Sequence, residues 1–352
     1  MSSAAQTSES LSARLRRATN DYTVTPEQYA LVALVALVAL TVIVATGAAV
    51  RLTGSGLGCP TWPKCYGNVY PPLNTHAVIE FSNRMITAPV SIAAGLAWLL
   101  ALRRRPYRRD LMWLGALLPL GVIGQAVLGG FTVKGELDYG WVMGHFALSM
   151  LILLAAVILL WRSREDQPGA RAEHDAAERP QATPESGLVK PLWGLVVLGA
   201  VTIFAGTAAT AAGPHAGGSP GQKINRLDFD GRGTMDFVIH RHAEIAFVFS
   251  LLAVGTWWLA RRRGVAERVQ RPLTVLCVLL ALQGVVGLDQ YETHLPTELV
   301  WVHVCLASCA WIATLWAASA AGVLAPRRLR RGSGRRPDSS VRVASPIEFP
   351  GN

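Results

Sequence analysis

Charged side chains are scarce in this sequence. Only 16% of its 352 residues are Asp, Glu, Lys or Arg, whereas soluble globular proteins average about 25%. Residues 29–50 contain no charge at all, and this run is long enough to cross a bilayer, which needs about 20 apolar residues. The shortage of charge excludes an ordinary soluble domain and predicts an all-α integral membrane protein.

Eight segments have the length and polarity of transmembrane helices. The first follows a polar leader of more than twenty residues and is too long to be the apolar region of a cleaved signal peptide. We expect a disordered leader (1–27), a first group of four helices (28–162), a cytoplasmic linker (163–190), a second group of four (191–322) and a disordered basic tail (323–352). The predicted spans are 29–50, 77–102, 111–131, 140–161, 191–212, 238–260, 272–290 and 298–322.

Acidic residues are fewer than basic ones, and the net charge is +10. The basic clusters occur after every second span and at both termini, as the positive-inside rule requires, so the charge does not indicate nucleic-acid binding. This pattern predicts a multi-pass protein of the cell membrane with both termini cytoplasmic and with contacts to anionic lipid. The clusters are 14–17, 103–109, 261–271 and 327–336, and the predicted outer loops are 51–76, 132–139, 213–237 and 291–297.

The two groups of helices resemble each other in sequence. A shift of 158 residues places "QAVLGGF…WVMGHFALS" on "QGVVGLD…WVHVCLA" and His145 on His303. A shift of 159 places Asn83 on His242, while His240 would need a shift of 157 and is the second choice. The repeat predicts two tandem, pseudo-symmetric four-helix bundles with two inward positions each.

A pair of histidines facing each other from two helices is a common way to hold a haem iron. His242 and His303 are therefore the predicted axial ligands of a low-spin b-type haem. His145 would bind a second haem, but Asn83 opposite it is a poor iron ligand, so one position there is weak or open. The competing interpretations are histidines that only pack helices together, and a zinc site, which lacks the further Cys or carboxylate ligands that it would need.

Glu80 and Arg84 lie at the start of the second span, where ionisable groups are costly and are functional candidates. Glu80 is one turn from Asn83 and would carry protons or position a reacting group at the pocket; alternatively it is an interfacial carboxylate bonded to a loop. Arg84 would neutralise a haem propionate, or else extend to the membrane surface.

Cysteine is absent from the outer loop of the second half but occurs twice in that of the first. Cys59 and Cys65 lie on the oxidising side of the membrane, where a disulfide is favoured over two free thiols. Such a bridge would make the loop a rigid lid over the pocket of the first bundle, or would make it responsive to redox conditions. The other cysteines, Cys277, Cys305 and Cys309, are expected to be packing residues.

The ordered motifs "TGSGLGCPTWPKC", "IEFSNR", "GHFALS", "GPHAGG", "HAE" and "WVHVCLA" resemble the haem A synthase family over nearly all of 28–322. The resemblance implies an oxidoreductase of haem biosynthesis that acts on a CH3 group. It would oxidise the C8 methyl of haem O to a formyl by successive hydroxylations, giving haem A for aa3-type oxidases. It also implies that Glu80 is catalytic, that His145 binds the substrate haem, and that His242 and His303 bind a resident haem b.

Two features depart from the family pattern. Many members have histidine where this chain has Asn83, and some have a second cysteine pair that is absent here. The "EFSN" and "GPHAGG" forms resemble the actinobacterial branch.

The implied partners are haem O and haem A, haem O synthase, oxidase assembly factors, lipid and a second copy of the chain. The alternatives are a non-enzymatic di-haem cytochrome b that carries electrons and a transporter with tandem repeats.

Overall fold

The computed structural model describes residues 22–165, 187–219, 221–229 and 233–324. Within these ranges the chain forms eight helices that are long and apolar enough to cross a membrane, which confirms the predicted number of spans. The helices are α2 (Pro26–Leu52), α3 (Thr75–Arg103), α4 (Arg109–Lys134), α5 (Tyr139–Arg164), α7 (Val189–Ala212), α8 (Thr234–Arg262), α9 (Glu267–Glu292) and α10 (Thr297–Ala320). The predicted leader, the tail beyond 324 and most of the linker lie outside the described residues.

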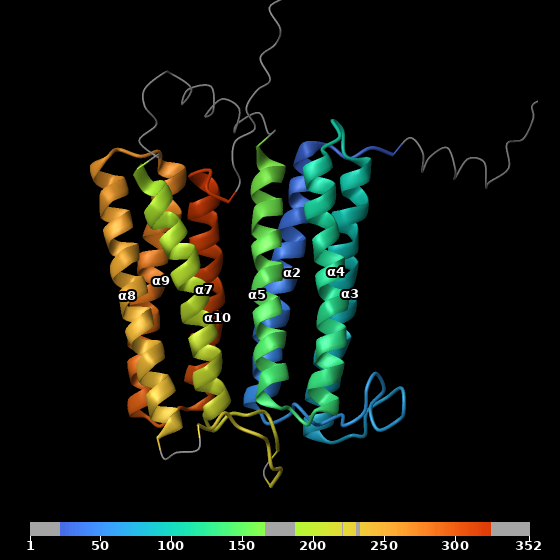
Figure 1. The fold of residues 1–352 in the computed structure, drawn as a ribbon. Helices are drawn as coiled ribbons and strands as arrows, with labels where there is room; N and C mark the ends of the chain where they lie inside the picture. Colours follow the sequence, from blue (N-terminus) through green and yellow to red (C-terminus); the bar gives the residue numbers. More distant parts are fainter. Residues whose placement is uncertain (1–21, 166–186, 220, 230–232, 325–352) are drawn as a thin grey trace, which may run out of the picture.

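The helices form two four-helix bundles that lie side by side (Figure 1). In the first bundle α2 packs on α3, α3 on α4, α4 on α5, and α5 on α2. In the second, α7, α8, α9 and α10 form the same closed ring. The bundles meet where α10 packs on α2 and α5, and where α5 packs on α7. The predicted architecture of two tandem bundles is therefore confirmed.

The repeat is visible in the backbone. Helices α4 and α9 begin and end at a shift of 158 residues, and α3 and α8 begin and end at a shift of 159. The turn after α4 has positive φ at Glu136 (51°) and Leu137 (62°), and the turn after α9 has positive φ at His294 (61°) and Leu295 (62°). Non-glycine residues seldom adopt this conformation, so its recurrence at one register marks the two halves as copies of one unit.

Most helix ends lie a few residues beyond the predicted spans, because hydropathy detects only the part that would lie in hydrocarbon. Helix α7 ends at the predicted residue 212, and α10 ends at Ala320, two residues before its predicted end. Side chains cap the N-termini of three helices: Thr25 and Gln28 form a reciprocal capping box at α2, and Asn74 accepts a hydrogen bond from the backbone N–H of Ala77 at α3. Asp138 accepts from Gly140 in the same way at α5. Such capping lets these three helices begin outside the apolar segment.

The loops that were predicted to lie outside in the two halves join at one end of the molecule (Figure 1). The backbone N–H of Gly56 donates to the carbonyl of Gly217 (2.8 Å), and Ser219 Oγ donates to the carbonyl of Gly54 (2.9 Å). Arg51, at the end of α2, donates to the carbonyl of Thr210 on α7 (3.1 Å). The second half therefore helps to hold the loop that covers the first.

Candidate functional site: two unequal histidine sites

His242 and His303 face each other inside the second bundle. Their ring centroids are 6.2 Å apart and their ring planes make an angle of 69°. Two imidazoles that bind opposite sides of one metal ion at about 2 Å each would place their centroids about 6.3 Å apart. The observed spacing therefore fits one ion held between the two rings.

The nitrogen atoms of these rings are disposed for binding a metal. His242 Nδ1 lies 3.1 Å from the carbonyl oxygen of Thr202, so Nδ1 carries the proton and donates it, which leaves the lone pair of Nε2 available. The buried Nδ1 of His303 has no hydrogen-bond partner among the described residues, and neither has the Nδ1 of His145. Buried histidines that serve only helix packing usually satisfy these atoms.

A glycine on the preceding helix faces each of the four inward residues. A Cβ at Gly206 would lie 3.0 Å from His242 Cε1, and one at Gly287 would lie 3.4 Å from His303 Cε1. In the first bundle the same relation joins Gly129 to His145 (3.5 Å) and Gly47 to Asn83 Nδ2 (4.0 Å). Glycine at these positions therefore lets the inward side chain of the following helix pack closely against the preceding helix.

The site in the first bundle is chemically different. The amide oxygen of Asn83, the only atom through which a carboxamide readily binds a metal, accepts a hydrogen bond from Thr46 Oγ1 at 2.7 Å. His145 is held from its backbone, because Gln125 Nε2 donates to the His145 carbonyl oxygen (2.9 Å). This bundle therefore offers one imidazole and no second strong ligand at the equivalent position.

Glu80 is buried beneath the first outer loop. One carboxylate oxygen accepts a hydrogen bond from the backbone N–H of Cys59 (2.7 Å), and the other forms an ion pair with Arg84. Arg84 in turn donates to the carbonyl oxygens of Cys59 (2.9 Å) and Thr61 (3.0 Å) and lies over the ring of Trp62. Both charged residues at the start of α3 therefore fasten the loop to the bundle.

The predicted disulfide between Cys59 and Cys65 is present, and both residues are buried. The bridged loop rests on two helices. A Cβ at Gly58 would lie 2.2 Å from the carbonyl oxygen of His76 on α3, and one at Gly130 on α4 would lie 2.8 Å from the Trp62 ring. Because such contacts leave no space for a side chain, the loop is a tightly seated lid on the first bundle.

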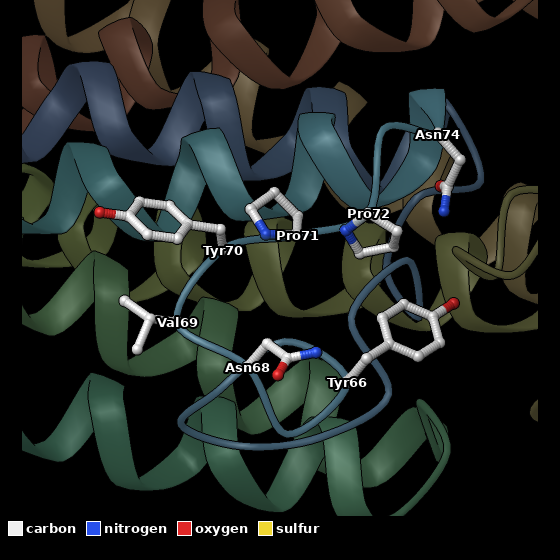
Figure 2. A pocket seen from close by; sticks show the side chains of 7 residues that line it. All are labelled: Tyr66, Asn68, Val69, Tyr70, Pro71, Pro72 and Asn74. Atoms are coloured by element: carbon white, nitrogen blue, oxygen red, sulfur yellow. The ribbon is translucent and has the colours of Figure 1, made fainter.

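His240 does not lie opposite His303. Its ring is exposed, its Nδ1 bonds the carbonyl oxygen of Asp236 (2.7 Å), and its nearest ring contact is Tyr291. A pocket in the loop between α2 and α3, shown in Figure 2, includes none of the predicted site residues; its lining residues are Tyr66, Asn68, Val69, Tyr70, Pro71, Pro72 and Asn74. Among the described residues, no three His, Cys, Asp or Glu side chains gather as a zinc site would require.

Sequence reasoning missed the residues that hold the ligand positions from outside. Thr46 and Thr202 contact Asn83 and His242 from neighbouring helices. Trp301, two residues before His303, donates its indole N–H to the carbonyl oxygen of Ala45 across the bundle interface (2.9 Å). None of these residues belongs to a local motif, so the sequence gave no signal for them.

The fold and sites define a multi-pass membrane protein built from two copies of one bundle, with a bis-histidine site in one and a single-histidine site in the other. A family profile described as cytochrome oxidase assembly protein (COX15-CtaA) matches residues 30–315. The chain belongs to this family.

Three curated relatives are each named heme A synthase. That of Shouchella clausii is 30% identical over 262 residues, which is 70% of this chain and 79% of the relative. That of Shewanella oneidensis is 26% identical over 298 residues, which is 74% of this chain and 87% of the relative. That of Lysinibacillus sphaericus is 38% identical over 121 residues, and this match spans only 39% of the relative.

Proposed function

We propose that the chain is a haem A synthase, which oxidises the C8 methyl of haem O to a formyl group and so yields haem A for aa3-type oxidases. The observation that carries the proposal is the inequality of two otherwise matched sites. His242 and His303 form a closed pair, whereas His145 is matched by Asn83, whose amide oxygen is already bonded to Thr46. A di-haem electron carrier would be served better by two histidine pairs.

In this proposal the second bundle (191–322) holds a resident haem b between His242 and His303. When bound, haem b would supply reversible one-electron transfer. The Thr202 carbonyl keeps His242 in the tautomer that presents Nε2, and the glycines at 206 and 287 let both rings pack closely against α7 and α9. A site that has a histidine on each side suits a permanently bound cofactor.

The first bundle (28–162) would bind haem O as substrate through His145. Because Asn83 is not free to act as a second ligand, the substrate could enter and leave, and the opposite side stays accessible for the reaction. Glu80 would carry the protons that successive hydroxylations release towards the outer surface. Arg84 would serve the substrate by holding the bridged loop above the pocket, since its donors contact loop carbonyl oxygens.

We further propose that the protein lies in the cell membrane with both termini cytoplasmic. The basic residues 103–109 and 261–271 support this orientation, because they fall at the ends of α3 and α8 opposite the disulfide-bridged loop. Haem O synthase and oxidase assembly factors are the expected protein partners, and the actinobacterial affinity of the sequence remains a prediction.

The test is pigment extraction from protein purified from cells that make haem O. Haem O or haem A is expected together with haem b; haem b alone would overturn the synthase proposal and favour the electron carrier.

The Glu80→Gln side chain can still accept a hydrogen bond from Cys59 but carries no charge, so haem O or a hydroxylated intermediate should accumulate while haem b is retained. Glu298→Gln, at an exposed position at the start of α10, should leave the pigments unchanged. Normal haem A levels in Glu80→Gln would remove Glu80 from the mechanism.

A further inference from the structure

The side-chain amide of Asn83 is held in one orientation. Its oxygen accepts a hydrogen bond from Thr46 Oγ1 on α2 at 2.7 Å, while Thr46 Oγ1 lies 3.3 Å from the carbonyl oxygen of Ile43. A hydroxyl has a single hydrogen to donate, so the shorter bond takes it. The amide nitrogen carries two N–H donors and has no hydrogen-bond partner among the described residues. Asn83 therefore keeps two unused donors inside the first bundle.

The unused donors occupy the branch of the side chain that carries the metal-binding nitrogen in the second bundle. In His242 the atom that branches from Cγ towards the preceding helix is Nδ1, which bonds the carbonyl oxygen of Thr202. In Asn83 the corresponding atom is the amide oxygen, which bonds Thr46. The other branch from Cγ leads to Nε2 in His242 and is the amide nitrogen in Asn83. Since Nε2 is the nitrogen available to a metal, the Asn83 donors lie on the side of the metal position.

The amide is smaller than an imidazole and ends short of this position. Nε2 of histidine is two bonds from Cγ, whereas the amide nitrogen of asparagine is one bond from it. Outside the backbone of α2, the only atom within 4 Å of a Cβ at Gly47 would be Asn83 Nδ2, at 4.0 Å, whereas one at Gly206 would meet the His242 ring at 3.0 Å. The place that Nε2 takes in the second bundle is therefore left to a small molecule in the first.

The hydroxyl that orients the amide occurs only in the half that contains the amide. At the register of 159 residues, Asn83 matches His242 and Thr46 matches Ala205. Alanine has no hydroxyl, and the second bundle has no amide at this position to orient. Thr46 and Asn83 therefore form one unit that directs N–H donors into the first bundle.

We propose that Asn83 donates a hydrogen bond to a small diatomic ligand on the open side of a haem that His145 holds. Carbon monoxide, nitric oxide and dioxygen form this class, in which one atom binds ferrous iron and the outer atom accepts a hydrogen bond. Donors beside the open side of a haem govern how such ligands bind. The inference rests on the proposed binding of haem by His145, but it does not depend on the oxidation of a methyl group.

The test is infrared spectroscopy of the reduced protein under carbon monoxide, after purification from cells that make haem O. The pair of His242 and His303 fills both positions of its haem, so the carbon monoxide adduct reports on the first bundle. His145→Leu should lose the adduct. Asn83→Leu should keep it with a higher C–O stretching frequency, because a hydrogen bond to the outer atom lowers this frequency. Asn83→His should lose carbon monoxide binding, since a second imidazole fills the open position.

A matched pair of threonine variants tests the orientation of the amide. Thr46→Val removes the hydroxyl that holds the amide, so the C–O band should broaden or move to higher frequency. Thr41→Val makes the same change on α2 where the hydroxyl bonds only its own helix, at the carbonyl oxygen of Leu37, and should leave the band unchanged. Where Asn83→Leu lost its haem, Thr46→Val alone would decide.

The outcomes separate this inference from the proposed function. A C–O frequency that Asn83→Leu does not change, an adduct that survives in His145→Leu, or no adduct in protein that contains haem O would overturn the inference alone. Haem b as the only pigment, with an adduct that responds to Asn83→Leu, would overturn the synthase proposal and support the inference. Protein whose first bundle holds no haem would overturn both.

Discussion

At the scale of single residues, the identity of a ligand is decided by which side chain the helix turns inward. His240 and His242 are separated by two positions, so they lie on different sides of α8. His242 contacts Gly206 and Thr202 on α7 and faces His303, whereas His240 is exposed and bonds its own helix. The orientation of its side chain therefore favours His242, rather than His240, as the residue that pairs with His303 in the second bundle.

His242→Leu should abolish the low-spin haem b spectrum, because Leu cannot bind iron and His303 would have no partner. His240→Leu should retain the spectrum, since it removes only an exposed ring. Optical spectra of the two purified variants in the reduced state provide the comparison. Loss of the haem b spectrum in His240→Leu with retention in His242→Leu would show that the repeat register is wrong by two residues.

At the scale of helices, each ligand position depends on a pair: one helix supplies the inward side chain and its predecessor supplies a glycine. The sequence alone predicted the eight spans and the shift between halves, because hydropathy and repeated motifs are local signals. It also predicted the disulfide. It could not predict that Thr46 engages Asn83, or that Arg84 fastens the loop, because these contacts join residues far apart in the chain. Contacts between residues so far apart in the chain leave no periodic pattern in the sequence.

Gly206→Ala should weaken haem b binding in the second bundle. The added Cβ would meet His242 Cε1 at 3.0 Å, and the ring or the helix would have to move. Overpacking of this kind costs about 1–3 kcal/mol, or roughly a five- to hundredfold loss of affinity. Haem content per protein measures it. Gly284→Ala, a helical glycine with nothing within 4 Å of an added Cβ, is the control and should keep full haem content.

At the scale of the whole molecule, the two bundles are joined by specific contacts as well as by the chain. Trp311 on α10 is buried and donates its indole N–H to the carbonyl oxygen of Met150 on α5 (3.1 Å). Trp301 makes the same kind of bond to Ala45 on α2. These contacts hold α10, which carries His303, against both helices that flank it in the first bundle, so the distance between the two sites is fixed by packing.

Trp311→Ala should therefore separate the bundles more readily than any lipid-facing substitution. Two halves expressed together as separate chains, 1–175 and 176–352, should co-purify, since the interface rather than the connection holds them. Trp311→Ala should reduce their co-purification strongly, because removing a buried Trp costs about 3–5 kcal/mol. Trp193→Ala, at an exposed position on α7, is the matched control and should have little effect. Equal co-purification in the two variants would mean that the contacts of Trp311 are not needed to hold the halves together.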